Sequence, residues 1–399
     1  MFRSGARAWG PAHISSIGNA LAGVSFFALA ATLTLAPAAA DDFTPYVSGE
    51  ILFELENDNV FSSSDPDAEF NSLYPTVELA AIIGLTPVFS INFGLTMEQV
   101  ADPDADNYFK DIGLYIDTVN IQAELMGATF VAGKFAPTFG KAWDETPGLF
   151  GTDLAEDYEI SEMIGFGVAY PFDAGDNGTH TLSANAFFVD TTFMSESLFT
   201  NRGRVSTADG GPANTGTLDN FSITLDGEEI SSVPGLSYNL GFTYLSAGVG
   251  DVADQTGYVF GLTHSTDLDN GATVGVIGEI AYFNNAGGTL DDATYYTAGL
   301  SFEKDSWHGE LAGTIRQIDL AADGSQTTRL FQASGGYVFE NEVDLTLGYA
   351  HVDEAGTISH TVGIQLSKSF SFATPGAPEE EFDLPERRPV RETVPTIVQ

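Results

Sequence analysis

The chain has 399 residues, with 56 Asp or Glu against 14 Lys or Arg, and its formal net charge is −42 at pH 7. A chain this acidic repels phosphate backbones and anionic headgroups, which excludes nucleic acid as a partner. Cysteine is absent, and this excludes disulfides, thiolate metal sites and cysteine nucleophiles.

Residues 1–40 have the features of a secretory signal peptide. Arg3 and Arg7 supply a positive start, an apolar run spans 20–36, and Ala38-Ala39-Ala40 fits a cleavage site before Asp41. An uncleaved membrane anchor is the alternative. After residue 40, no uninterrupted apolar run reaches the roughly 18–20 residues of a transmembrane helix, so the sequence predicts none.

Alternation with period two starts at about 46–56, where Ile51, Phe53 and Leu55 share one face and Glu50 and Glu54 the other. Such a strand has one face in an apolar medium and the other in water. The pattern recurs along the chain. It predicts sixteen strands, at about 46–56, 72–83, 88–99, 112–125, 128–136, 158–170, 180–191, 219–229, 236–247, 256–266, 272–283, 293–303, 306–317, 327–339, 343–352 and 358–372.

The connections alternate in length. Those after odd-numbered strands are long and acidic or glycine-rich, such as 57–70, 100–110, 137–157 and 192–218, whereas most of those after even-numbered strands are short. Bacterial membrane barrels have short periplasmic turns and longer external loops. The parity therefore predicts that both ends of the barrel face the periplasm.

The last predicted strand, 358–372, would close the structure. It resembles the terminal sorting strand of bacterial outer-membrane proteins, which typically ends in an aromatic residue, here Phe372. Without a helix, only a closed barrel spans lipid with every backbone group paired. The predicted fold class is therefore all-β, an antiparallel up-and-down transmembrane β-barrel of about sixteen strands over 41–372. A large soluble β-sandwich or β-helix is the alternative.

Residues 373–399 differ from the rest, with five prolines, the run Glu379-Glu380-Glu381 and the basic residues Arg387, Arg388 and Arg391. This composition predicts a disordered or extended periplasmic tail. A contact with peptidoglycan or a periplasmic protein is a second interpretation. The other partners expected are outer-membrane lipid and, through the terminal strand, the barrel-assembly machinery.

The loop 137–157 is the candidate pore constriction, because it follows the fifth strand, as does the inward-folded loop of general porins. An acidic loop inside a pore would repel anions and concentrate cations. A solvated external loop is the alternative. Its candidate residues are Lys141, Asp144, Glu145, Asp153, Glu156 and Asp157, together with Trp143 and Phe150.

The polar faces of the strands supply a second set of pore residues. Acids outnumber bases there, so we expect a modest cation preference, since salt screens charges across a wide pore. The acids are Glu50, Glu54, Glu78, Glu98, Glu124, Glu279, Glu310 and Asp344, and the bases are Lys134, Arg316 and Arg329.

Metal and catalytic chemistry have little support in the sequence. The stretches 65–69 and 102–106 alternate carboxylates but lack the glycine and distal glutamate of an EF-hand, so loose divalent binding is the most they suggest. No histidine lies in a zinc-protease or serine-hydrolase motif, although His351 and His360 fall on adjacent strands near Ser359 and Asp353. We predict no catalytic residues, no metal site and no cofactor.

The fifth strand reads FVAGKFAPTFG over 130–140, and EISEMIGFG follows at 159–167. The first segment is similar to the G-[KQ]-F-x-x-P-F segment of substrate-specific porins, including phosphate porins and LbtU-type siderophore porins, and the second resembles the siderophore-porin pattern. The resemblance implies a porin barrel, and classical porins form homotrimers. The basic ladder of phosphate porins is missing here.

These observations predict a passive outer-membrane diffusion channel for small hydrophilic solutes with cation preference. A substrate-specific channel of the siderophore type, an outer-membrane hydrolase and a structural or adhesive barrel are the alternatives.

Overall fold

The computed structural model describes residues 43–378 except 102, 104 and 203–205. The predicted signal peptide and most of the predicted tail, 379–399, lie outside the described residues. Within the described part of the chain, no helix is long and apolar enough to cross a membrane.

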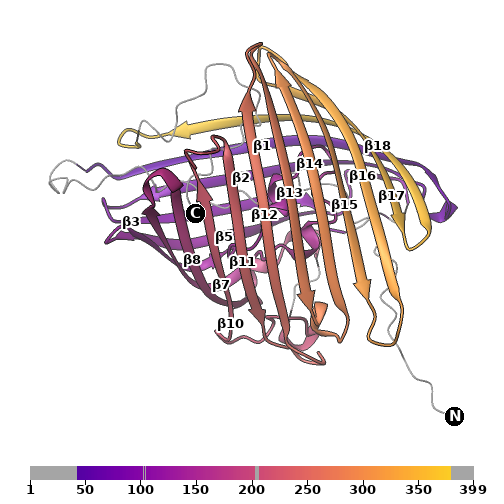
Figure 1. Cartoon of the computed structure of the whole chain (residues 1–399), viewed down its shortest axis with the longest axis horizontal. Helices are drawn as coiled ribbons and strands as arrows, with labels where there is room; N and C mark the ends of the chain where they lie inside the picture. The colour runs from indigo at the N-terminus through magenta and orange to yellow at the C-terminus, as the bar shows by residue number, and fades with distance from the viewer. Residues whose placement is uncertain (1–42, 102, 104, 203–205, 379–399) are drawn as a thin grey trace.

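Sixteen long strands of the described residues form one closed antiparallel sheet, in which each strand pairs with its neighbours along the chain and β18 pairs with β1 (Figure 1). The predicted fold class is confirmed. The long strands are β1 (Tyr46–Ser63), β2 (Asn71–Gly84), β3 (Phe89–Gln99), β5 (Ile112–Leu125), β6 (Ala128–Phe135), β7 (Met163–Asp173), β8 (Thr179–Val189), β10 (Asn220–Glu228), β11 (Leu236–Leu245), β12 (Gln255–Asp267), β13 (Ala272–Asn284), β14 (Asp292–Lys304), β15 (Trp307–Asp319), β16 (Ser325–Val338), β17 (Asp344–Glu354) and β18 (Thr357–Ala373).

Short elements lie in the connections. Two-residue strands extend the sheet locally: β4 pairs with β2, and β9 pairs with β5. The short elements are β4 (Asn107–Tyr108), β9 (Leu198–Phe199), α1 (Ala142–Glu145), η1 (Pro66–Ala68), η2 (Glu156–Tyr158), η3 (Gly175–Asn177), η4 (Phe193–Ser195), η5 (Thr207–Asp209) and η6 (Ala286–Gly288).

All sixteen predicted strands are present, but two boundaries were wrong. β1 continues to Ser63, seven residues past the predicted end, and β7 starts at Met163 because 158–162 belongs to the preceding loop. The short turns gather at one end of the barrel, the turn end, and the longer connections at the other, the loop end. Both limits of the described chain lie at the turn end, where Thr374 donates its backbone N–H to the carbonyl of Val47 (2.9 Å).

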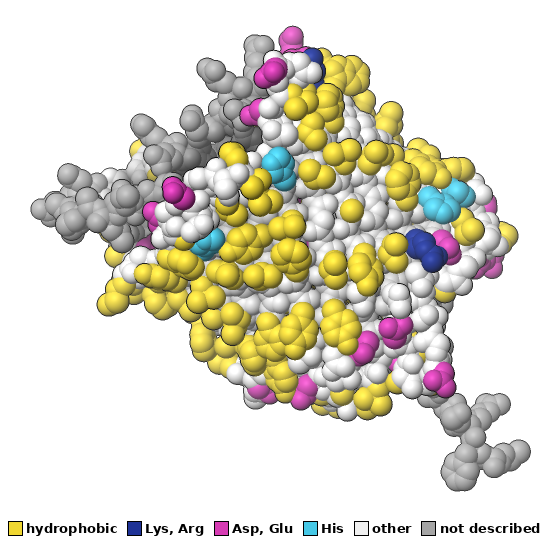
Figure 2. Space-filling view, in the orientation of Figure 1, with side chains coloured by type: hydrophobic (Ala, Val, Ile, Leu, Met, Phe, Trp, Pro, Cys, Tyr) yellow, Lys and Arg dark blue, Asp and Glu magenta, His cyan; other side chains and the backbone are white. Residues whose placement is uncertain are grey.

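The outer face of the barrel is apolar. Side chains that alternate with the buried ones are exposed although they are large and hydrophobic, and Figure 2 shows them covering the visible strands. Because a soluble protein rarely exposes so much contiguous apolar surface, this face fits contact with lipid chains. Examples are Leu240, Phe260, Ile280, Leu300, Leu311, Phe331, Leu347, Ile364 and Leu366.

Candidate functional site

The loop between β6 and β7, residues 136–162, lies inside the barrel. Its first half contacts the lumen side of β10, where the hydroxyls of Thr138 and Thr224 are 3.0 Å apart. Its tip reaches β17 and β18 on the far side, where Phe150 is completely buried. This inner loop, as we call residues 136–162, therefore crosses the lumen instead of lying in external solvent.

One carboxylate holds the start of the inner loop. Glu279, on the lumen face of β13, accepts the backbone N–H of Lys141 (2.8 Å) and of Ala142 (3.2 Å), and also the hydroxyl of Tyr158 (2.6 Å). Because Lys141 and Tyr158 belong to the outgoing and returning halves of the loop, Glu279 joins both halves to the wall.

Apolar packing supports the same attachment. Phe139, Trp143 and Tyr158 of the inner loop form a buried cluster with lumen-facing side chains of β12 to β14, among them Phe283 and Tyr295. The rings of Phe139 and Phe283 have centroids 5.7 Å apart, and those of Tyr158 and Tyr295 5.0 Å. These strands carry apolar side chains on both faces, because one face meets lipid and the other meets the loop.

Glycines on the wall make room for the tip of the loop. A Cβ on Gly348 would lie 2.9 Å from the Leu149 side chain, and one on Gly363 would lie 2.6 Å from the Phe150 ring. Side chains at these positions would clash, so the strands approach the loop by backbone contact alone. The returning half is held by Arg316 of β15, whose guanidinium is 2.6 Å from the Asp157 carboxylate.

A row of carboxylates faces the inner loop from the first strands of the barrel. This acidic wall consists of Glu54 on β1, Glu78 on β2, Glu98 on β3 and Asp117 on β5. The charge of Glu78 is repelled by the other three and also by Asp144 of the inner loop, so acids of the loop and of the wall face one another. One carboxylate oxygen of Glu78 has no hydrogen-bond partner among the described residues.

The acids of the inner loop repel one another and the wall. Burial raises the pKa of Asp144 to about 8, with the Glu145 charge adding to the effect and Lys141 opposing it. Burial and the charges of Glu98 and Asp157 raise the pKa of Glu156 to about 7, against a hydrogen bond from Thr152. Near neutral pH the loop therefore changes its charge.

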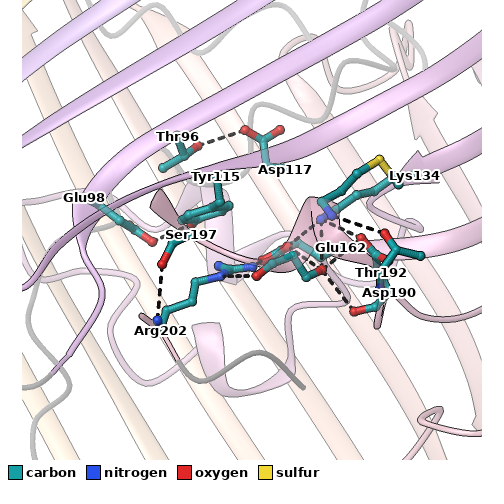
Figure 3. Close-up of polar contacts among 12 residues, drawn as sticks. Thr96, Glu98, Tyr115, Asp117, Lys134, Glu162, Asp190, Thr192, Ser197 and Arg202 are labelled. Atoms are coloured by element: carbon teal, nitrogen blue, oxygen red, sulfur yellow. Dashed lines mark hydrogen bonds and ion pairs between the residues drawn. The ribbon is translucent and has the colours of Figure 1, made fainter. Parts of the chain in front are cut away.

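Figure 3 shows a second polar cluster, at the loop end of β3, β5 and β6. Lys134 ends β6 with its ammonium 2.7 Å from Glu162 and 2.9 Å from Asp190. Arg202, from the loop between β8 and β10, forms an ion pair with the other oxygen of Glu162, and its guanidinium carbon lies 3.5 Å from the Tyr115 ring centroid. The Tyr115 hydroxyl in turn donates to Glu98 (2.5 Å).

Most predicted pore residues lie on the lumen side or in the inner loop, but not all are available to a solute. The prediction that Lys134 lines the pore needs correction, because its side chain has no exposed surface. Its ammonium forms ion pairs with Glu162 and Asp190. Arg329 was wrongly expected on the lumen face. It lies on the outer face at the loop end, 3.3 Å from Asp353.

The remaining predicted residues fall into three places. Glu50 and Glu124 lie toward the turn end, Glu124 accepting hydrogen bonds from Gln122 and Thr129. Glu310 and Asp344 hold His308 between them, at 2.5 and 3.1 Å. In the inner loop, Lys141 lies 3.1 Å from Glu145, and Asp153 has one carboxylate oxygen without a partner among the described residues.

Several residues of the site were missed: Tyr115, Asp117, Glu159, Glu162, Asp190 and Arg202. Only Arg202 could have been singled out from the sequence. Basic residues are rare, with 12 after residue 40, so each one is a candidate partner for the many acids. Glu159 is repelled by Glu156, Asp144, Glu162 and Glu98, so it joins the inner-loop acids to the second cluster.

The histidines named from the sequence do not pair with the serine. His351 and His360 face outward, with ring centroids 5.0 Å apart, and the Tyr349 hydroxyl is 2.7 Å from His360 Nδ1. Ser359 faces the lumen, 2.9 Å from the Ser63 hydroxyl. No group of three or more His, Asp or Glu in the described residues is arranged to hold a metal ion, and Asp102 and Asp104 lie outside them.

No protein-family model matches the sequence, and no curated protein matches it. Solved structures do match the fold. The outer membrane channel DcaP of Acinetobacter baumannii aligns with a TM-score of 0.54 at 11% identity, covering 81% of this chain and 96% of its own. OprB of Pseudomonas putida gives 0.58 at 10%, covering 82% and 94%, and OccD3 of Pseudomonas aeruginosa gives 0.50 at 13%, covering 84% and 94%. The chain thus has the fold of these barrels.

Proposed function

We propose that this protein is an outer-membrane porin, a passive channel for small hydrophilic solutes with a preference for cations. The observation that carries the proposal is the inner loop, which crosses the lumen and places its acids opposite the acidic wall. The fold shared with DcaP, OprB and OccD3, the first described as an outer membrane channel, supports the same function.

The charges of the inner loop and the acidic wall support cation preference. The basic side chains near them are each within ion-pair distance of an acid: Lys134, Lys141, Arg202 and Arg316. Glu78, Asp153 and Glu159 each retain an oxygen without a partner among the described residues. A cation that enters therefore meets acceptors, whereas an anion meets no uncompensated base.

The orientation follows from the same proposal. With an even number of strands, both barrel ends of the chain lie at the turn end, and in bacterial porins that end faces the periplasm. A substrate-specific channel, as the resemblance to siderophore porins suggests, is the second candidate, because the inner loop and Arg202 both narrow the space available to a solute.

The proposal is tested by ion conduction. The refolded chain in a planar bilayer is expected to show stepwise conductance, and a KCl gradient should give a reversal potential of cation-selective sign. A folded, heat-modifiable barrel that conducts no current would overturn the porin assignment. Anion-selective current would leave a porin but remove its cation preference.

Cation preference should increase with pH. Asp144 and Glu156 have raised pKa values of about 8 and about 7, so both are largely neutral at pH 6 and largely ionised at pH 9. Raising the pH across this window adds about two negative charges beside the permeation path. The cation-to-anion permeability ratio from reversal potentials should therefore rise, by roughly twofold to threefold at low salt.

The variant D144N/E156Q removes both titrating groups and should flatten this pH profile. D305N changes an exposed aspartate in the turn between β14 and β15 and serves as the matched control, with the wild-type profile expected. An unaltered pH profile in D144N/E156Q would show that these two acids do not face the permeating ions.

A further inference from the structure

The guanidinium of Arg202 occupies a site built by the barrel wall, the inner loop and the connection between β8 and β10. One of its nitrogens pairs with Glu162, its Nε donates to the carbonyl of Ser195 (3.0 Å), and its carbon lies 3.5 Å from the Tyr115 ring centroid. The charge of Glu98 attracts it as well. A carboxylate, a carbonyl and an aromatic face are all groups that a guanidinium binds.

The receiving groups are held independently of Arg202. Tyr115 and Glu98 stand on neighbouring strands and bond each other at 2.5 Å. Glu162 is fixed through its other oxygen by Lys134, whose side chain is fully buried. Removing Arg202 would therefore leave the two carboxylates and the ring in place, so the site does not depend on the side chain that fills it.

Arg202 is partly accessible to solvent. Its side chain is 18% exposed and that of Glu162 is 21% exposed, so solvent and small solutes reach the pair. The residue belongs to a connection between β8 and β10, not to a strand. A second guanidinium in its place would make the same contacts with Glu162 and the Tyr115 ring, so the exchange preserves the ion pair and the stacking contact.

We propose that Glu98, Tyr115 and Glu162 form a binding site for guanidinium-bearing solutes, and that Arg202 is an internal competitor that such a solute displaces. The planar fork of a guanidinium can pair with Glu162 while its face covers the Tyr115 ring. A quaternary ammonium offers no N–H donor, and an anion is repelled by both acids. The proposal deepens the proposed function and rests on it for the route of entry, but binding itself requires no conduction.

The test uses agmatine, a dication with one guanidinium, and hexamethonium, a dication without N–H donors, as the matched control. Binding is measured by isothermal titration calorimetry on the refolded full chain in detergent. The variant R202A should bind agmatine about tenfold more tightly than the wild type, because a tethered competitor at an effective concentration in the millimolar range is removed. R202A/E162Q should lose that gain, and hexamethonium should bind neither protein measurably.

R202K guards against a folding defect in R202A. It retains the positive charge but not the planar guanidinium, so its affinity for agmatine should fall between those of wild type and R202A. R329A changes an exposed ion pair on the outer face and should bind agmatine as the wild type does. Equal agmatine affinity in wild type, R202K and R202A would overturn the inference, and so would equal binding of the two cations.

Conduction separates this inference from the proposed function. If the barrel conducts and agmatine blocks R202A at lower concentration than the wild type, both are supported. If the barrel conducts but agmatine blocks R202A and wild type equally, the guanidinium site is contradicted and the porin function is supported. If neither protein conducts while calorimetry shows the expected order of affinities, the porin function is contradicted and the guanidinium site is supported.

Discussion

Replacing Glu279 with alanine should release the inner loop and enlarge the channel. Three donors, the N–H groups of Lys141 and Ala142 and the Tyr158 hydroxyl, would lose their common acceptor. A buried donor left unpaired costs about 1–3 kcal/mol, so the loss of an acceptor shared by three donors should weaken the docking of the loop by roughly 3–9 kcal/mol. We expect a larger single-channel conductance with frequent current fluctuations, because the loop would move in and out of the lumen.

E279Q provides a graded comparison, since its amide oxygen still accepts and its NH2 group does not. Its conductance should fall between those of E279A and wild type. E342A, in an exposed turn between β16 and β17, is the matched control and should leave the current unchanged. A quiet E279A channel of wild-type conductance would mean that the apolar cluster of Phe139, Trp143 and Tyr158 holds the loop alone.

Replacing Lys134 with methionine should give a large loss of stability. The side chains of Lys134 and Asp190 are both fully buried, and Glu162 shares the same ammonium. Removing the cation leaves carboxylates in a desolvated site, which typically costs about 3–5 kcal/mol. Equilibrium urea unfolding of the refolded barrel, followed by tryptophan fluorescence, measures the loss.

Two further variants show whether charge is the cause. K134M/E162Q/D190N removes the cation together with both carboxylates, and most of the lost stability should return, since neutral groups of similar volume need no counter-charge. Arg202 loses Glu162 in this variant, but its side chain is 18% exposed and reaches solvent. R329M breaks an exposed pair and should change stability by less than about 0.5 kcal/mol. If the triple variant is no more stable than K134M, lost packing rather than unpaired charge explains the effect.

The strands could be predicted because lipid and water impose a period of two on each of them. The signal weakens where this contrast ends. Past Glu56, polar residues occupy both faces of β1, so Asn57 and Asn59 resemble a loop although they pair with β2 and β18. Conversely, Tyr158 and Ile160 alternate as in a strand, but they belong to the inner loop and pack in its buried apolar cluster.

A β-bulge explains why Tyr115 and Asp117 were missed. In β5, Val119 and Ile121 face lipid, so simple alternation places all odd-numbered residues of the strand outside. The pairing with β3 shifts between Gly94 and Thr96, where Thr118 and Tyr115 are the partners, and the parity changes. Both polar side chains thereby turn inward, and Asp117 accepts a hydrogen bond from Thr96 (2.9 Å). A single sequence contains no clear mark of such a bulge.

Whether the inner loop enters the lumen depends on tertiary contacts that its own residues do not reveal. The better signal lay in β13, where Ile277, Ala281 and Phe283 add apolar residues to the face that should be wet. A second apolar face on a barrel strand indicates that a protein segment covers it. The pairing of Glu162 and Asp190 with Lys134 and Arg202 could not be predicted, because it joins residues from one strand and two separate connections.

The seam between β1 and β18 has a consequence for assembly. It joins partners 296 to 327 residues apart in the chain, such as Ser63 with Ser359 and Val47 with Thr374. Bringing such distant segments together costs about 5 kcal/mol of chain entropy before any seam contact forms. Until then the sheet has two long open edges that invite pairing with other chains. Because the seam contacts have such high contact order, closure of the barrel is expected to be the slow step of folding and the one most open to aggregation. A chain that stops before residue 357 lacks β18 and cannot close with this register.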